Sequence, residues 1–248
     1  MSDLDRFSAP PSRPPRPAAL TAGRIDIWRV DLNPPENQMA SYRALLSPDE
    51  RMRADRFHFD RHRRRYIVGR GALRRLLGQY LDQPAATLSF AYGPKDKPFL
   101  PDTTLQFNLT NSHELALIAI TEEVELGVDV EHLRAMPDAE AVAERHFSAS
   151  ERRALRSVPS EAKELAFFRC WTRKEAYVKA LGDGLSLPLD RFDVSLEEAR
   201  FLALDGDPAK AAEWSLFHVN PGPGYVGAVA VPGRGWELRG WRWEPEEG

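Results

Sequence analysis

A long helical pattern over residues 160–181 places the tightest limit on how this chain can fold. It stops at Gly182, a residue that readily takes the left-handed conformation found at helix ends. With 3.6 residues per turn, a helix that buries Trp171 carries Glu175 and Lys179 to the edge of the surface it packs against. Charges at such an edge cost free energy unless they are matched. The alternative is an exposed Glu–Lys pair that contributes only a few tenths of a kcal/mol.

The stretch 126–131, LGVDVE, alternates apolar and polar residues as a half-buried strand does. Asp129 and Glu131 then point to one face, roughly 7 Å apart, and Gly127 beside them leaves room for another group. Neighbouring carboxylates repel each other, and Mg²⁺ commonly binds one or two of them together with water and phosphate oxygens. Asp129, Glu131 and Glu175 therefore predict a three-carboxylate metal site suited to phosphate chemistry. The alternative for this strand is a solvated polar face.

Three motifs together resemble the signature of the 4′-phosphopantetheinyl transferase superfamily: GVDVE at 127–131, WTRKEAYVK at 171–179 and GDGLSLPLDRF at 182–192. The chain is most similar to the larger, single-chain, surfactin-synthetase-activating type, over about residues 25–231. This resemblance implies an enzyme that uses Mg²⁺ to transfer phosphopantetheine from coenzyme A to a serine of an apo acyl or peptidyl carrier protein. Adenosine 3′,5′-bisphosphate is the other product of that reaction.

The resemblance also implies the architecture. We expect an α/β (α+β) fold made of a pseudo-twofold pair of similar subdomains, each with helices and a small, mostly antiparallel sheet, and coenzyme A in the cleft between them. Residues 23–122 form the predicted N-terminal subdomain and residues 123–248 the C-terminal one, although no internal repeat relates their sequences. Residues 1–22 contain five prolines among small and polar residues, which predicts a disordered tail.

The composition predicts where the protein works. Cys170 is the only cysteine, so an intrachain disulfide and a cysteine metal cluster are excluded, as is usual in a reducing cytosol. No apolar run approaches the ~18 residues of a transmembrane helix, and the N-terminus lacks the apolar core of a signal peptide. We therefore expect a cytoplasmic monomer without a membrane partner.

Ten arginines lie between residues 51 and 75, in two predicted helices separated near residues 58–60. Most of them are expected on solvated helix faces. The net charge of −3 and the lack of a recognised nucleic-acid module argue against a nucleic-acid partner. In the family this region holds the phosphates of coenzyme A, and arginine forks match phosphate oxygens. Our candidates for that contact are Arg53, Arg65 and Arg70.

The loop 93–99, GPKDKPF, resembles the Gly-Lys-Pro loop that the family places beside the adenine. Lys97 and Pro98 match that loop and are expected to contact coenzyme A. Asp96 stands where the family usually has glycine, so a contact through this residue departs from the family pattern.

Residues 106–110 and 115–121 predict a hairpin whose turn begins at Asn111. The family usually has Asn-hydrophobic-Ser-His-Ser here, and its histidine helps to hold the 3′-phosphate. This chain reads NLTNSH from residue 108, which places Asn111 at the histidine position with Ser112 beside it. An asparagine amide donates to a phosphate but adds no positive charge. The alternative contact is His113, two residues further on.

Glu151 allows two interpretations. It completes a capping box with Ser148, and it also falls where the family has an acid near the metal that can act as a base. A serine hydroxyl needs a base, so the predicted catalytic residues are Glu175, Lys179 and Glu151, with a metal-bound water as the alternative base. Lys179 is expected to neutralise charge on the phosphoryl oxygens. Lys174 lies in an apolar stripe and either reaches the surface or binds a buried anion, with the phosphates of coenzyme A as our candidate.

Two alternative functions are compatible with the same carboxylates. One is a different Mg²⁺-dependent nucleotide phosphotransferase, against which the absence of a P-loop or kinase glycine loop argues. The other is a coenzyme A or carrier-protein binding module without turnover. The intact acidic residues and lysine argue against it.

Overall fold

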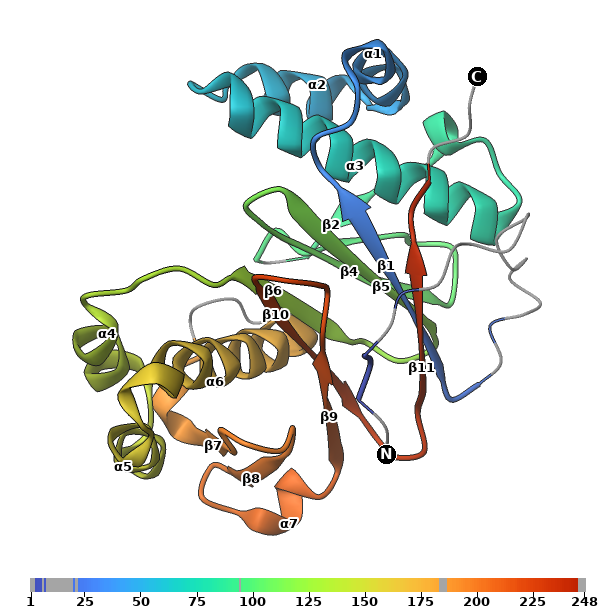
Figure 1. Cartoon of the computed structure of the whole chain (residues 1–248). Helices are drawn as coiled ribbons and strands as arrows, with labels where there is room; N and C mark the ends of the chain where they lie inside the picture. Colours follow the sequence, from blue (N-terminus) through green and yellow to red (C-terminus); the bar gives the residue numbers. More distant parts are fainter. Residues whose placement is uncertain are drawn as a thin grey trace.

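The computed structural model describes residues 3–5, 7, 20, 22–93, 95–182 and 187–244 of the chain. Two lobes, each a small sheet covered by helices, make up the mixed α/β fold (Figure 1). The predicted fold class is confirmed.

The N-terminal lobe holds the first five strands and the first three helices. Its elements are β1 (Arg24–Asp31), α1 (Glu36–Leu45), α2 (Pro48–Asp55), α3 (Asp60–Leu81), a 3₁₀ turn (Ala85–Thr87), β2 (Ala91–Tyr92), β3 (Pro98–Phe99), β4 (Leu105–Ser112) and β5 (Leu115–Glu122). The predicted break between the two arginine-rich helices falls between α2 and α3 and is confirmed. Helix α1 was not predicted; it begins after Pro35, without a side-chain cap hydrogen bond that would mark its start.

The C-terminal half of the chain supplies the remaining elements. They are β6 (Gly127–His132), α4 (Ala139–His146), α5 (Ala149–Ser157), α6 (Ser160–Leu181), a 3₁₀ turn (Leu189–Arg191), β7 (Phe192–Val194), β8 (Phe201–Leu204), α7 (Pro208–Ala211), β9 (Trp214–Val219), β10 (Tyr225–Pro232) and β11 (Glu237–Arg242). Helix α6 covers the predicted range and ends at Gly182, whose φ of 73° is left-handed. Residues 183–186 of the third family motif lie outside the described residues.

The two main sheets face each other across a shared apolar layer. One has the strand order β11-β1-β5-β4 and the other the order β6-β10-β9. Side chains such as Leu117 of β5 and Val128 of β6 fill the layer between them and are fully buried. A second cluster, including Trp28 and Leu73, lies between α3 and the first sheet. A third cluster lies between the second sheet and α6. The three clusters therefore fill the spaces between layers in the order helix, sheet, sheet and helix.

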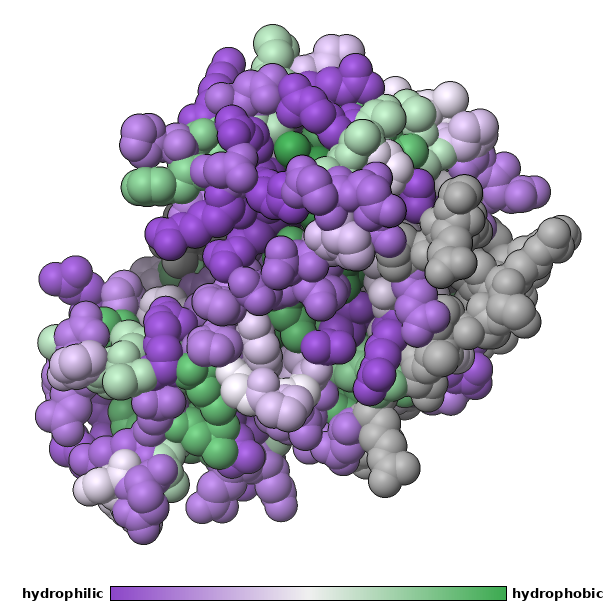
Figure 2. Space-filling model, turned by 45° about the horizontal axis from the view of Figure 1, so that its top comes forward, coloured by the Kyte–Doolittle hydropathy of each residue, from purple (hydrophilic) through white to green (hydrophobic). Residues whose placement is uncertain are grey.

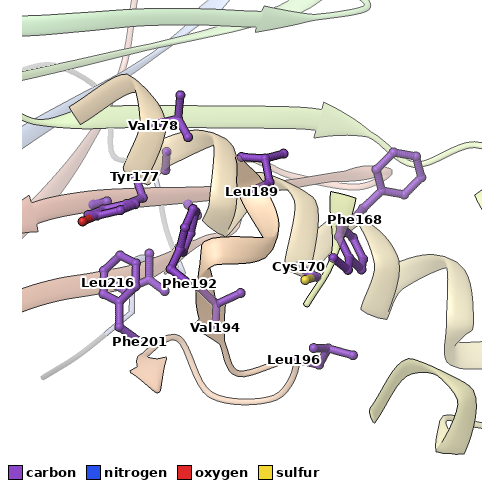
Figure 3. Packing of buried hydrophobic residues seen from close by; sticks show 14 of the residues in the cluster. Phe168, Cys170, Tyr177, Val178, Leu189, Phe192, Val194, Leu196, Phe201 and Leu216 are labelled. Carbon is purple, nitrogen blue, oxygen red and sulfur yellow. The ribbon is translucent and has the colours of Figure 1, made fainter. Parts of the chain in front are cut away.

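Helix α6 covers the other side of the second sheet and is itself enclosed by β7 and β8 (Figure 1). The ring of Tyr177 packs edge-on against Phe192 and Phe201, with ring centroids 4.8 and 5.0 Å apart (Figure 3). Edge-to-face contacts of this kind add to the stability gained from burying the rings. The helix is thus buried on two sides, which explains why its apolar pattern is broad.

Both ends of the chain cross to the opposite lobe. Strand β11 pairs in parallel with β1, so the last strand of the predicted subdomain 123–248 belongs to the sheet of the first subdomain. At the other end Leu4 pairs in parallel with Val219 of β9, donating its N–H to His218 O at 3.0 Å and accepting from Asn220 N at 2.9 Å. The two lobes are therefore linked by more than the β5–β6 connection.

The prediction of a disordered tail is wrong for Leu4 and Leu20, which are buried. Leu4 adds an apolar side chain to the layer between the sheets, and its backbone pairs with the open edge of β9. Composition did not reveal this, because two leucines among prolines bury little in isolation. Residues 8–19 of the predicted tail lie outside the described residues.

Within the described part of the chain, no helix has the length and apolar character needed to cross a membrane.

The contacts of Leu4 lead to a first prediction. Leu4→Ala should lower the free energy of unfolding by about 2 kcal/mol, the low end of the range for a buried leucine. Leu202→Ala is the matched control, because Leu202 is exposed on β8 and its truncation should change stability little. Urea unfolding of both variants measures the difference. Equal stabilities would show that the N-terminal segment does not contribute to the folded state.

Candidate active site

The site forms where α6 lies directly on β6. A Cβ atom at Gly127 would lie 2.0 Å from Ala176 O and 2.3 Å from Ala180 N, so only glycine allows this approach. The group for which Gly127 leaves room is therefore the backbone of α6. Because side chains alternate along a strand, Asp129 faces the helix as well.

Asp129 and Lys179 are the closest pair in the site. Lys179 Nζ donates to Asp129 Oδ1 at 2.6 Å and to Thr110 Oγ1 at 3.0 Å, and the Thr110 hydroxyl donates to the same carboxylate oxygen at 3.1 Å. Asp129 is 5% exposed. Burial raises the pKa of its carboxyl group, and the Lys179 ammonium opposes that rise. The carboxylate is thus kept out of water and depends on nearby positive charge.

Glu175 is the second acidic group that faces this place. Burial raises the pKa of its carboxyl group, and the charge of Asp129 and, more weakly, Glu131 raises it further. The three predicted carboxylates therefore influence one another, as the helix and strand patterns indicated. Within the described residues, Glu175 Oε1 and Asp129 Oδ2 are buried oxygens without a hydrogen-bond donor.

These two oxygens indicate whether the residues of the site could bind a metal ion. Among the residues that the structure describes, no three Asp, Glu, His or Cys side chains are already arranged to hold one. Lys179 is the cation that Asp129 contacts instead. Buried carboxylate oxygens without a donor are costly, and a hard divalent cation with oxygen ligands would satisfy them. The donor set therefore fits such a cation, although the site is not preformed.

Glu131 lies further out, at the seam between the lobes. Ser112 Oγ donates to Glu131 Oε2 at 2.8 Å, and Arg134 Nη1 donates to the same oxygen at 3.2 Å. Ser112, predicted as a coenzyme A contact, thus binds a predicted metal ligand in this structure. Sequence analysis missed Thr110, although it lies two residues before Ser112 on the same face of β4.

Glu151 and Lys174 lie in the core of the C-terminal lobe. Lys174 Nζ is 2.8 Å from Glu151 Oε1, and their side chains are 0% and 1% exposed. Glu151 Oε2 accepts from Ser148 N at 2.9 Å, and Oε1 accepts from a backbone N–H of β7 at 2.8 Å. Lys174 also donates to two backbone carbonyls beside β7, at 2.7 and 2.6 Å.

The capping-box interpretation of Glu151 is therefore the one that the structure shows. Both of its oxygens are occupied, which leaves none to take a proton from a substrate. The buried anion that Lys174 contacts in this structure is Glu151. Within the described residues, neither side chain forms a hydrogen bond or ion pair with the carboxylates on β6, because Lys174 projects from α6 towards α5 and β7.

The three arginine candidates differ in exposure. Arg70 is 6% exposed, forms an ion pair with Glu50 and donates to Tyr92 Oη at 2.9 Å, so its guanidinium is already used. Arg53 is exposed and lies over the ring of Tyr66, 5.8 Å from its centroid. It borders a cavity of about 340 Å³ that Tyr66 and Tyr92 also line. The surface of this lobe is largely hydrophilic in Figure 2, as expected for solvated arginine-rich helices.

Arg65 lies nearer the β4–β5 turn. Its Nη2 is 4.0 Å from Glu114 Oε1, and its side chain is 19% exposed. Arg53 and Arg65 thus remain accessible to an anion, unlike Arg70.

The loop that resembles the adenine-binding loop reaches the C-terminal lobe. Lys97 Nζ donates to Glu125 Oε2 at 2.9 Å and to Ala180 O at 3.3 Å. Pro98 begins β3 and is half-buried. Asp96 has a left-handed φ of 60°, which explains why glycine is usual at this position and why aspartate is tolerated.

The β4–β5 turn is shorter than predicted. Strand β4 continues through Asn111 and Ser112, so the turn consists of His113 and Glu114 alone. Asn111 is exposed and, by strand alternation, lies on the opposite face from Ser112. The ring of His113 stacks on that of His132, with centroids 4.7 Å apart.

The buried Glu151–Lys174 pair leads to a second prediction. Glutamine would preserve the hydrogen bonds of the cap, but it would leave the Lys174 ammonium buried without a counter-charge. We expect Glu151→Gln to reduce the free energy of unfolding by about 3–5 kcal/mol. Ser148→Ala, which removes only the cap hydroxyl, should cost about 1 kcal/mol. Chemical denaturation distinguishes the two.

The double variant Glu151→Gln/Lys174→Met serves as the control for this effect, because it removes both charges. It should be more stable than Glu151→Gln alone. If Glu151→Gln is as stable as the unmodified protein, the pair does not hold the lobe together.

Two family models match consecutive parts of the chain. The one described as "4′-phosphopantetheinyl transferase, N-terminal" matches residues 30–125. The one described as "4′-phosphopantetheinyl transferase superfamily" matches residues 125–230. They meet in the connection between β5 and β6, where the lobes are joined.

Individual relatives agree with this result. The chain is 42% identical to 4′-phosphopantetheinyl transferase HetI of Nostoc sp. over 238 residues, covering 92% of this chain and 97% of that protein. It is 34% identical to a putative 4′-phosphopantetheinyl transferase of Synechocystis sp., covering 73% of this chain and 75% of the relative. Identity to 4′-phosphopantetheinyl transferase Sfp of Bacillus subtilis is 26%, over 80% of this chain and 89% of Sfp.

Proposed function

Since the chain belongs to the 4′-phosphopantetheinyl transferase superfamily, we propose that it transfers phosphopantetheine from coenzyme A to a serine of an apo acyl or peptidyl carrier protein. One observation supports assigning this chemistry to Asp129, Glu175 and Lys179. Asp129 Oδ2 and Glu175 Oε1 are buried without donors next to the Lys179 ammonium, within the described residues. Two buried carboxylate oxygens beside an ammonium group suit a divalent cation and a phosphate group bound together.

Asp129, Glu131 and Glu175 are the proposed ligands of Mg²⁺. When bound, the cation would neutralise negative charge on the pyrophosphate of coenzyme A and help to orient it. The three carboxylates come from β6 and α6, two elements whose relative position Gly127 fixes. The ligands are thereby held on rigid secondary structure rather than on loops.

Lys179 is the proposed electrostatic catalyst. Its ammonium is 29% exposed and held by Thr110 and Asp129, so it can reach a substrate without leaving the site. As the serine oxygen bonds to the β-phosphorus, negative charge grows on the phosphoryl oxygens, and a nearby ammonium stabilises it. The bond from that phosphorus to the bridging oxygen breaks, and adenosine 3′,5′-bisphosphate leaves.

Glu175 is the proposed base for the serine proton. Its Oε1 is buried without a hydrogen-bond donor within the described residues, so this oxygen is available to accept a proton. Glu151 does not fit this task, because it is enclosed with Lys174. A water bound to the cation is the alternative base.

Coenzyme A is proposed to lie along the seam towards the basic helices of the N-terminal lobe. Arg53 and Arg65 are the accessible candidates among the predicted arginines there, and Asn111 lies on the face of β4 that is turned away from the carboxylates. Lys97 and Pro98 border the same seam from the other side. The 3′-phosphate would therefore be held apart from the pyrophosphate.

The cytoplasm is the proposed compartment. Cys170 is buried, and burial raises the pKa of its thiol well above the usual value, so it is protected from oxidation and thiol exchange.

The transferase proposal is tested by mass spectrometry of an apo carrier protein incubated with coenzyme A, Mg²⁺ and the protein. The carrier should gain one phosphopantetheine group. Asp129→Ala should abolish the gain, because it removes a proposed cation ligand and the partner of Lys179. Asp102→Ala alters an exposed turn acid and should be as active as the unmodified protein. Substantial transfer by a folded Asp129→Ala variant would exclude the proposed metal site.

The proposed 3′-phosphate contact is tested separately. Asn111→His should tighten binding of coenzyme A, because a histidine adds a donor that can carry charge. The gain should be smaller for dephospho-coenzyme A, which lacks the 3′-phosphate. Isothermal titration with both ligands measures this. An equal gain for both, or loss of the preference for coenzyme A in His113→Ala alone, would transfer the contact to His113.

A further inference from the structure

Strands β4 and β6 are edge strands of different sheets, yet they lie side by side at the seam between the lobes. Edge strands expose backbone groups that need partners. Here the partners are side chains of β4. Asn108 Oδ1 accepts from Val128 N at 2.9 Å, and Ser112 Oγ accepts from His132 N at 3.1 Å.

The same face of β4 also contacts both acidic residues of β6. Thr110 Oγ1 donates to Asp129 Oδ1 at 3.1 Å, and Ser112 Oγ donates to Glu131 Oε2 at 2.8 Å. Asn108, Thr110 and Ser112 alternate along β4, so all three point across the seam. A strand of one lobe therefore aims the carboxylates of the other.

Ser112 performs both tasks with one hydroxyl group. Because its oxygen accepts from the His132 N–H, its proton is directed at Glu131 Oε2. Among the described residues, the other side chain that holds Glu131 is Arg134, which is 53% exposed, and exposed ion pairs contribute little. The hydroxyl thus fixes one carboxylate oxygen, Oε2, and thereby the orientation of the Glu131 carboxylate.

From this geometry we propose that Ser112 is a positioning residue that holds Glu131 for the divalent cation. The inference rests on the proposed metal site and adds that its affinity depends on a residue of the other lobe. Partners that orient a metal ligand typically change metal affinity about 10–100-fold when they are removed. Ser112 is a better test than Thr110, because Thr110 also contacts Lys179.

The experiment measures Mn²⁺ binding to the full chain saturated with coenzyme A, by electron paramagnetic resonance of free Mn²⁺. Ser112→Ala should weaken binding about tenfold or more. Ser112→Thr retains the hydroxyl and should restore most of the affinity. Raising the Mg²⁺ concentration should recover much of the transfer rate of Ser112→Ala, since the lost quantity is cation affinity.

Asn108→Ala is the matched control on the same strand and face. The hydrogen bond that the Asn108 side chain forms within the described residues is to the backbone of β6, so its loss should lower the melting temperature while Mn²⁺ affinity is kept. In a Glu131→Ala background, Ser112→Ala should weaken binding no further, because the two residues act as one unit.

Two results would overturn the proposal. Ser112→Ala with a lower melting temperature and unchanged Mn²⁺ affinity would make Ser112 a seam contact only. If Ser112→Ala weakened Mn²⁺ binding by the same factor in the Glu131→Ala background as in the unmodified protein, Ser112 would not act through Glu131. Failure of the transferase proposal itself is distinguishable, because then the unmodified protein would not modify an apo carrier protein at any Mg²⁺ concentration.

Discussion

Helix α6 touches strand β6 backbone to backbone, and the arrangement of the site depends on that contact. Gly127 permits it, since a side chain there would meet the carbonyl of Ala176. The contact brings Asp129 opposite Lys179 and removes the pair from most of the surrounding water. Charges in such a place interact more strongly than on the surface, because water screens them less. The close approach thus strengthens the attraction between Asp129 and Lys179, and it also costs free energy because both charges are partly removed from water.

The two lobes are held together by exchanged segments and by polar contacts, rather than by a single interface. Strand β11 completes the first sheet, and Leu4 covers the edge of β9 in the second. Between them the side chains of β4 pair with the edge of β6. Each sheet edge near the seam is therefore used, which limits unwanted pairing with other chains. The proposed ligands for coenzyme A and the cation lie along this same seam.

Local sequence patterns were sufficient for much of the fold. The helix over 160–181 and the alternating strand over 126–131 carry strong periodicity, and both form as predicted. Local patterns did not predict the structure of the N-terminal end, because Leu4 is held by residues more than two hundred positions away. They also misplaced the β4–β5 turn, since Asn111 and Ser112 have turn-like composition but are held in register by β5.

The sequence by itself determined which residues carry charge on α6 and β6, and its motifs indicated the family. Only the tertiary structure decided which partner each charge has. Lys174 and Lys179 lie five positions apart on one helix, so they project in different directions. The first is enclosed with Glu151 in the core, and the second meets Asp129 at the seam. Helical periodicity separates the two directions, but the packing of β7 and β6 against the helix determines which direction leads to the buried cap and which to the carboxylate at the seam.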